Sequence, residues 1–204
     1  MRRLLPLLAL LLFGCQNDPA VVTSKGTTEE GASRPSQATP ATGIQTKAPE
    51  SEAPKVQNPA TEKNDHKSRL YQLRDLAYTE IKVNGKPIPV WVMDTPGKRQ
   101  EGMMHLRAKD VTAEQGMLFV FPEDQEAGHG FWMSNTYLPL DIIYISPAGK
   151  VAHVVAGKPL DETSLESPAA FRTVLEMRGG GAERLGIKPG STVEIPDSVL
   201  KGAS

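Results

Sequence analysis

Short runs of apolar residues, bounded by glycine, proline and polar residues, follow one another after residue 78 and predict β-strands. Some runs are nearly continuous, as in a strand buried on both faces, and others alternate between apolar and polar residues. Asn84-Gly85 is a favoured hairpin turn, because both residues tolerate a positive φ angle. About seven or eight strands are expected, at residues 79–83, 88–93, 116–121, 141–145, 150–155, 171–177 and 191–195, with the apolar stretch 131–136 as the eighth candidate.

Short helices are predicted at two breaks in this pattern. Thr95 is a favourable N-cap, Pro96 suits the first helical position, and Gly102 can end a helix of one or two turns. A glycine turn at 179–181 opens a second short helix. Many short strands with tight turns and one or two short helices predict a mainly β fold, either a single compact β-sandwich or jelly-roll-like domain or a small barrel.

The N-terminus carries a different apolar run, Leu4–Phe13, directly after two arginines. Ten residues are too few to span a bilayer but suit the apolar core of a signal peptide. The run leads into Leu12-Phe13-Gly14-Cys15, which resembles the lipobox of bacterial lipoproteins. We therefore expect residues 1–14 to be a cleaved lipoprotein signal peptide and Cys15 to be acylated. The alternative is an ordinary secretory leader with an incidental cysteine.

Residues 16–69 contain no aromatic residue and only isolated apolar ones, among many Thr, Ser, Ala and Pro. Such a segment cannot bury enough apolar surface to offset its ordering entropy, so residues 15–69 are predicted to be a lipidated cysteine with a disordered tether. The folded domain is then residues 70–204. This organisation predicts a protein of the cell envelope, bound to the lipid bilayer through acylated Cys15. Gln16 favours the periplasmic face of the outer membrane if the cell has two membranes.

Charge and composition narrow the function classes. The net charge is −1, and residues 70–204 carry 14 basic and 17 acidic residues, so nucleic acid is not an expected partner. Cys15 is the only cysteine, which leaves the domain without disulfides or a thiol nucleophile. We expect a monomeric domain that is stabilised by packing alone.

Motifs for common enzyme classes are missing from the sequence. It contains no Gly-x-Ser-x-Gly elbow, no His-Glu-x-x-His and no P-loop, and no cofactor is predicted. Several methionines and histidines raise the question of a copper(I) site, but they form no Met-x-x-Met or His-x-His cluster, so no metal site is predicted. These residues are Met103, Met104, Met117, Met133, Met177, His105 and His129.

Five motifs in a fixed order resemble one family over about residues 76–196. They are Asp94-Thr95-Pro96 with Arg99 and Gly102-Met103-Met104, then Glu114–Phe121, Phe131–Thr136, Pro139–Asp141, and finally Val174–Glu176 with Ala182–Gly190. This chain is similar in them to the domain-of-unknown-function family numbered 192. The resemblance implies a β-sandwich or jelly-roll-like domain that is often exported and has no established activity. Family members often carry a cysteine pair in a loop that corresponds to residues 161–167, where this chain has none.

The candidate ligand site centres on Trp132, Asn135 and Asp141. An aromatic face beside an amide and a carboxylate suits a small polar ligand such as a glycan fragment. Arg99, Arg107 and Glu176 are expected to bring charge to the same cleft. The alternative is structural, with Asn135 and Asp141 capping a turn and Arg107 paired with Glu176 or Asp141.

Three functions remain open on these grounds. The first is a non-catalytic module that binds a small ligand, which the missing enzyme motifs favour. The second is an envelope hydrolase or transferase that uses Asp141 and Glu176 as an acid–base pair. The third is a domain that docks an envelope protein, which would need an exposed apolar patch.

Overall fold

The computed structural model describes residues 56–61, 63 and 65–204. The predicted signal peptide at residues 1–14, the lipidation site Cys15 and most of the predicted tether therefore lie outside the described residues. In the part of the chain that is described, no helix is long and apolar enough to cross a membrane.

The elements follow the predicted alternation of short strands and short helices. A 3-10 turn, η2 (Leu73–Asp75), precedes the first strand, and α3 is a short C-terminal helix beyond the predicted ones. The strands are β1 (Tyr78–Val83), β2 (Lys86–Met93), β3 (Gly116–Gln125), β4 (Gly130–Phe131), β5 (Leu140–Ile145), β6 (Val151–Gly157), β7 (Leu165–Glu166), β8 (Phe171–Arg178) and β9 (Val193–Glu194). The helices are α1 (Pro96–Glu101), α2 (Gly181–Leu185) and α3 (Asp197–Leu200).

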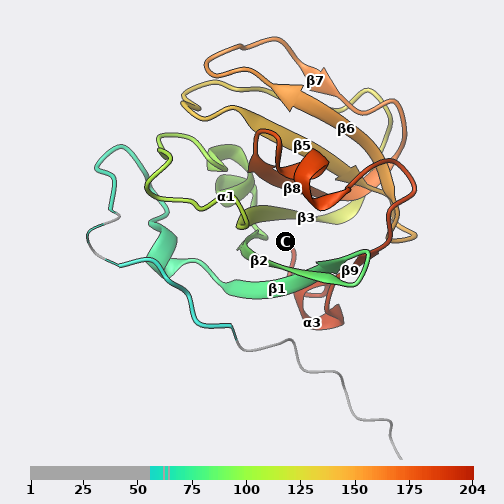
Figure 1. Ribbon diagram of the computed structural model, residues 1–204, viewed down its shortest axis with the longest axis horizontal. Helices are drawn as coiled ribbons and strands as arrows, with labels where there is room; N and C mark the ends of the chain where they lie inside the picture. The colour runs from blue at the N-terminus through green and yellow to red at the C-terminus, as the bar shows by residue number, and fades with distance from the viewer. Residues whose placement is uncertain (1–55, 62, 64) are drawn as a thin grey trace, which may run out of the picture. The chain divides into compact units, whose positions relative to one another are not determined.

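A curled seven-stranded sheet forms the body of the domain, in the strand order β6-β5-β8-β3-β2-β1-β9 (Figure 1). β4 and β7 form a separate two-stranded sheet. Neighbouring strands are antiparallel except β2 and β3, which are parallel. A parallel pair needs a crossover connection, and residues 94–115, which include α1, supply it. The predicted mainly β, compact domain with short helices is confirmed.

Both faces of the large sheet are covered, which explains the nearly continuous apolar runs of its central strands. Along β3, Met117 and Phe119 belong to a first core, and Leu118 and Val120 belong to a second core on the opposite face. The first core also contains apolar residues from the loop after α1 and from the loop after β4. The second is completed by α2, α3 and β9. The candidate site lies on the side of the first core.

Residues 56–69 differ from the predicted tether, because several of those that the structure describes contact the domain. The Asn58 side chain donates a hydrogen bond to the carbonyl of Leu73 (2.8 Å) and accepts one from Trp91 Nε1 (3.2 Å). The side chain of Arg69 is fully buried. Polar contacts and one buried charge order this segment, so its low apolar content does not reveal that it is part of the domain.

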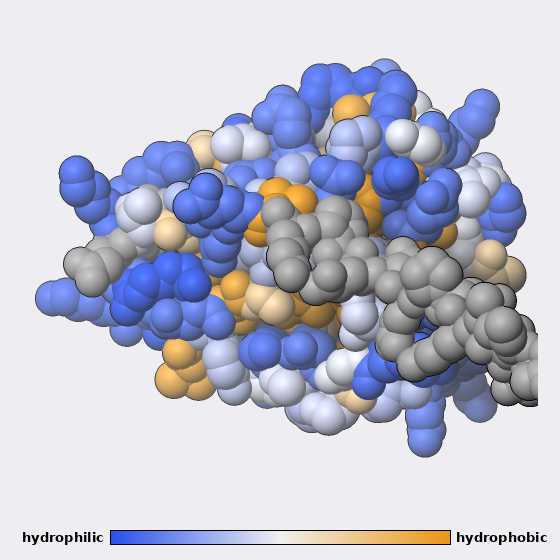
Figure 2. All heavy atoms as spheres, turned by 90° about the horizontal axis from the view of Figure 1, so that it is seen from below, coloured by the Kyte–Doolittle hydropathy of each residue, from blue (hydrophilic) through white to orange (hydrophobic). Residues whose placement is uncertain are grey.

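Exposed apolar residues are scattered. On the face shown in Figure 2, hydrophobic residues appear as small areas among hydrophilic ones. The exposed large apolar side chains of the described residues are Leu70, Trp132, Tyr137 and Leu160. Trp132 is the more exposed of the two aromatic residues, with 53% of its surface accessible. It lies at the rim of the pocket described below.

Candidate functional site

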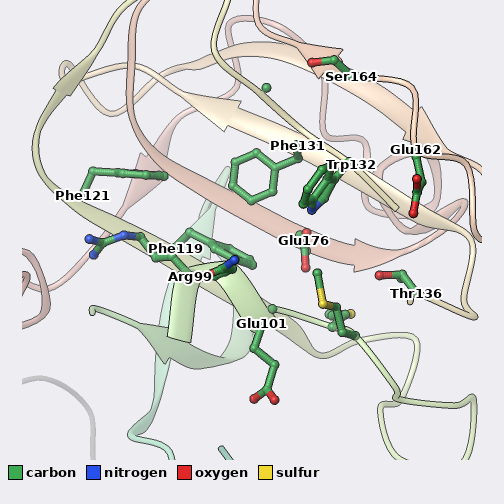
Figure 3. Close-up of a pocket in the computed structure, with 15 residues that line it drawn as sticks. Arg99, Glu101, Phe119, Phe121, Phe131, Trp132, Thr136, Glu162, Ser164 and Glu176 are labelled. Carbon is green, nitrogen blue, oxygen red and sulfur yellow. The ribbon is translucent and has the colours of Figure 1, made fainter. Parts of the chain in front are cut away.

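A pocket of about 450 Å³ lies between the end of α1, the strands β3 and β8, and the segment that follows β4 (Figure 3). Its size is within the range of about 300–1,000 Å³ that is usual for small-molecule sites. Four aromatic and two methionine side chains form its apolar walls, and its polar groups are three carboxyl groups, two hydroxyl groups, the amide of Gln100 and the guanidinium of Arg99. The residues that line it are Arg99, Gln100, Glu101, Gly102, Met103, Met104, Phe119, Phe121, Gly130, Phe131, Trp132, Thr136, Glu162, Ser164 and Glu176.

The end of α1 forms one wall, and local sequence explains its shape. The Thr95 side chain caps the helix by accepting a hydrogen bond from the backbone N–H of Lys98 (3.4 Å). Gly102 ends the helix with φ +46° and ψ −130°, a conformation that disfavours residues with a side chain. A Cβ atom on Gly102 would lie 2.9 Å from Phe119 Cζ and 3.3 Å from Glu176 Oε2. Glycine at this position therefore lets the chain turn closely against the pocket floor.

Aromatic rings make the apolar walls. Phe119 and Phe131 meet edge to face with their centroids 4.9 Å apart, and Phe131 contacts Tyr144 in a similar way at 6.0 Å. Trp132 follows Phe131, and its exposed ring lies beside that of Phe131 (Figure 3). The pocket thus has a rigid aromatic interior and an accessible indole at its mouth.

Glu176 supplies the polar group at the floor. The residue is 5% exposed, and cross-strand pairing places it between Met117 of β3 and Ile142 of β5. The backbone N–H of Met103 donates a hydrogen bond to its carboxyl group. The other carboxyl oxygen, Oε2, has no hydrogen-bond partner among the residues that the structure describes. Burial raises the pKa of Glu176 to about 8, although the Met103 N–H and the charge of Arg69 act in the opposite direction.

Beneath the floor lies a buried ion pair between Arg69 and Glu101. Arg69 Nη2 is 3.2 Å from Glu101 Oε2, and Arg69 Nη1 donates to the carbonyls of Gly102 (2.9 Å) and Met104 (2.6 Å). The carboxylate of Glu101 also accepts hydrogen bonds from the backbone N–H groups of Leu70 and Tyr71 (2.7 and 3.0 Å). Arg69 therefore holds the backbone that forms the pocket wall. Its burial lowers the pKa of its guanidinium, and the neighbouring carboxylates oppose this.

Three of the predicted site residues meet in this pocket: Trp132, Glu176 and Arg99. Arg99 lies at one end, where Nη1 donates to the Val120 carbonyl (2.8 Å) and Nη2 to the Ser204 carbonyl (2.9 Å). Its guanidinium carbon is 5.1 Å from the centroid of the Phe121 ring. Partial burial lowers the pKa of Arg99, and Asp94 opposes this. With these contacts, Arg99 helps to position Phe121 in the wall.

The other three predicted residues lie outside the pocket. Asp141 points to the second core, where its Oδ2 accepts a hydrogen bond from the backbone N–H of Ala182 (2.8 Å). Asn135 adopts φ +53° in a turn, which matches the structural alternative. Arg107 lies over the ring of Tyr137, 4.7 Å from its centroid, and the cation that faces Glu176 is Arg69 instead. The described residues contain no group of three His, Cys, Asp or Glu side chains suited to a metal ion.

Sequence reasoning missed two contributors to the site. Arg69 falls within the predicted tether because its sequence neighbours are polar, and no motif distinguishes it from a solvated arginine. Glu101 lies at the end of the predicted helix, where nothing in the sequence marks it as buried. The loop after α1 offers the only sequence signal, because Gly102 followed by two methionines indicates a close backbone turn beside apolar packing.

Two solved structures resemble the domain. A putative transcription regulator from Sinorhizobium meliloti 1021 is 30% identical, with a TM-score of 0.54, over 58% of this chain and 94% of its own. A protein of unknown function from Novosphingobium aromaticivorans DSM 12444 is also 30% identical, with a TM-score of 0.55, over 67% of this chain and 98% of its own. No curated protein matches the chain. The family DUF192, described as "Uncharacterized ACR", matches residues 79–195, and the chain therefore belongs to this family.

Proposed function

We propose that this protein is a non-catalytic module that binds a small ligand in the pocket between Trp132 and Glu176. The observation that carries the proposal is the Oε2 atom of Glu176, a buried carboxyl oxygen without a hydrogen-bond partner among the described residues, at the floor of an aromatic pocket. A buried polar group without a partner costs about 1–3 kcal/mol. Such a cost is typical of functional sites, where a ligand supplies the missing partner.

The surroundings of Glu176 support binding more than turnover. Acid–base hydrolysis needs a second carboxyl group that faces the same ligand. Glu101 is held by Arg69 and two backbone N–H groups, and Asp141 faces the second core. Glu162 accepts a hydrogen bond from Ser134 Oγ (3.0 Å) at the exposed rim. The acidic residues near Glu176 thus have structural partners of their own.

The proposal includes an envelope location. Cleavage before Cys15 and acylation of its thiol would hold the domain at the membrane, in reach of ligands outside the cytoplasm, and several acyl chains on one residue anchor stably. Growth with labelled palmitate tests this part. We expect label in the wild-type chain and none in Cys15→Ser, and equal labelling of the two proteins would overturn the anchor.

Binding itself is tested by thermal unfolding of residues 16–204, a chain that retains every described residue. The panel holds monosaccharides, peptidoglycan fragments, simple anions and small amines. A ligand at a hundred times its dissociation constant should stabilise the fold by about 2.7 kcal/mol, a shift of several degrees. Trp132→Ala should abolish the shift and stay folded.

Tyr137→Ala is the matched control, because Tyr137 is also an exposed aromatic residue but does not line the pocket. It should keep the shift. A stabilising ligand that is insensitive to Trp132→Ala would place the binding site elsewhere, and a panel without any stabilising compound would contradict the proposed function.

A further inference from the structure

Three of the four charged groups that line the pocket are carboxyl groups, and its neutral polar groups, such as the Gln100 amide and the Thr136 and Ser164 hydroxyls, carry no charge. The Glu176 carboxyl lies at its floor and the Glu162 carboxylate at its rim. The one guanidinium, that of Arg99, already donates to two carbonyls and lies over Phe121. A ligand that complements these carboxyl groups brings donors or positive charge.

The aromatic side chains of the pocket also favour a positively charged ligand. The face of an aromatic ring carries partial negative charge, so a cation near it is attracted, most strongly by Trp. Phe119, Phe131 and Trp132 lie around Glu176 in Figure 3. Rings grouped around a carboxyl group form the kind of cage that takes up ammonium ligands.

The buried charges beneath the pocket floor balance one another without Glu176. Arg69 faces Glu176 but is paired with Glu101, so these two buried charges compensate each other. Among the described residues, the other titratable group beside Glu176 on this face of the sheet is Tyr144 of the neighbouring strand β5, whose phenol has a pKa raised by burial and is neutral. An ionised Glu176 therefore lacks a cation of its own, in agreement with its pKa of about 8. A ligand with a positive charge would provide that cation.

We propose that the ligand carries an organic ammonium group, which lies among Phe131, Trp132 and Phe119 and pairs with the carboxylate of Glu176. This inference rests on the pocket's proposed function as a binding site. No bond to the ligand forms or breaks. Near neutral pH, Glu176 releases its proton to the solvent as the cation enters, so that the buried site remains neutral.

Three matched pairs of probes test charge separately from shape: phenethylamine with 2-phenylethanol, cadaverine with pentane-1,5-diol, and choline with 3,3-dimethyl-1-butanol. Titration calorimetry on residues 16–204 in two buffers of different ionisation enthalpy measures both affinity and protons released. We expect at least one amine to bind about tenfold or more tightly than its neutral partner, a difference of 1.4 kcal/mol. Below pH 8, its affinity should rise by up to about tenfold for each unit by which the pH increases. Binding should release up to about one proton.

Glu176→Gln keeps the shape of the side chain and removes its ability to ionise. It should lose the preference for the amine and the pH dependence, whereas Glu183→Gln, at an exposed position of α2 on the other side of the sheet, should keep both. Thermal unfolding shows whether each variant is folded. The pH dependence and proton release of the wild-type chain test the proposal even if Glu176→Gln does not fold.

The outcomes separate this inference from the proposed function. If neutral sugars bind and no amine exceeds its neutral partner, the pocket is a binding site and the ammonium inference is wrong. If an amine binds without proton release and Glu176→Gln binds it equally well, the cation does not use Glu176 and the inference is also wrong. If no compound binds, both proposals fail together.

Discussion

Asp141 and Glu176 belong to neighbouring strands, but their carboxyl groups face opposite sides of the large sheet. In the register between β5 and β8, Asp141 is paired with Met177 and Glu176 with Ile142. Cross-strand partners share a face, and successive residues of a strand alternate between faces. The pair that the sequence suggested as a hydrolytic centre is therefore separated by the sheet itself. Asp141 supports α2, and Glu176 belongs to the pocket.

This separation predicts that Asp141→Ala affects stability and leaves ligand binding unchanged. The buried carboxylate accepts a hydrogen bond from the Ala182 N–H, and its removal leaves that donor without a partner. We expect a loss of about 1–3 kcal/mol in the free energy of unfolding, measured by urea denaturation. Affinity for any pocket ligand should match wild type under conditions where both proteins are folded. Weaker binding by a folded variant would show that the two faces are coupled.

Glu176→Gln should change how stability depends on pH. The pKa of Glu176 is raised from 4.5 to about 8, so between these values the folded state keeps a proton that the unfolded state loses. The contribution of this group to stability is complete below pH 4.5 and is lost as pH rises through 8, with a slope of up to about 1.4 kcal/mol per pH unit.

The difference between wild type and Glu176→Gln isolates this contribution from those of other groups. Urea denaturation from pH 5 to pH 9 should show that the free energy of unfolding of the variant increases relative to that of the wild type as the pH rises. At pH 9 the variant should be the more stable protein. Parallel stability curves would mean that Glu176 has an ordinary pKa.

Arg69 gives a test of the segment before residue 70. Arg69→Met retains much of the apolar volume but leaves the carboxylate of Glu101 buried without its cation. Breaking a buried pair in this way costs about 3–5 kcal/mol. A double variant with Glu101→Gln should recover part of the loss, because the unpaired charge is then removed. A chain that starts at residue 70 should resemble Arg69→Met, and equal stability of that chain and one starting at residue 56 would contradict a role for this segment.

Much of the fold could be predicted because apolar periodicity reports burial directly. The hairpin turn at Asn84-Gly85 has positive φ at both residues, as its sequence required. The site was less predictable. Trp132 could be predicted because an aromatic face near an amide and a carboxylate suits ligand recognition, but the face that Asp141 occupies depends on its register with β8, which is distant in sequence. Arg69 was missed because its burial depends on Glu101, far along the chain.

Gly102→Ala should narrow the pocket as well as destabilise the domain. A Cβ at Gly102 would meet Phe119 Cζ at 2.9 Å and lie 3.3 Å from Glu176 Oε2, so a wall of the pocket must move. Gly85→Ala is the matched control, since Gly85 also has positive φ (+76°) but no atom within 4 Å of an added Cβ. Backbone strain alone should cost about 1–2 kcal/mol in the control. We expect Gly102→Ala to cost more and to weaken ligand binding, as measured by urea denaturation and calorimetry. Equal losses in the two variants would show that the pocket wall accommodates the methyl group and that Gly102 serves the turn only.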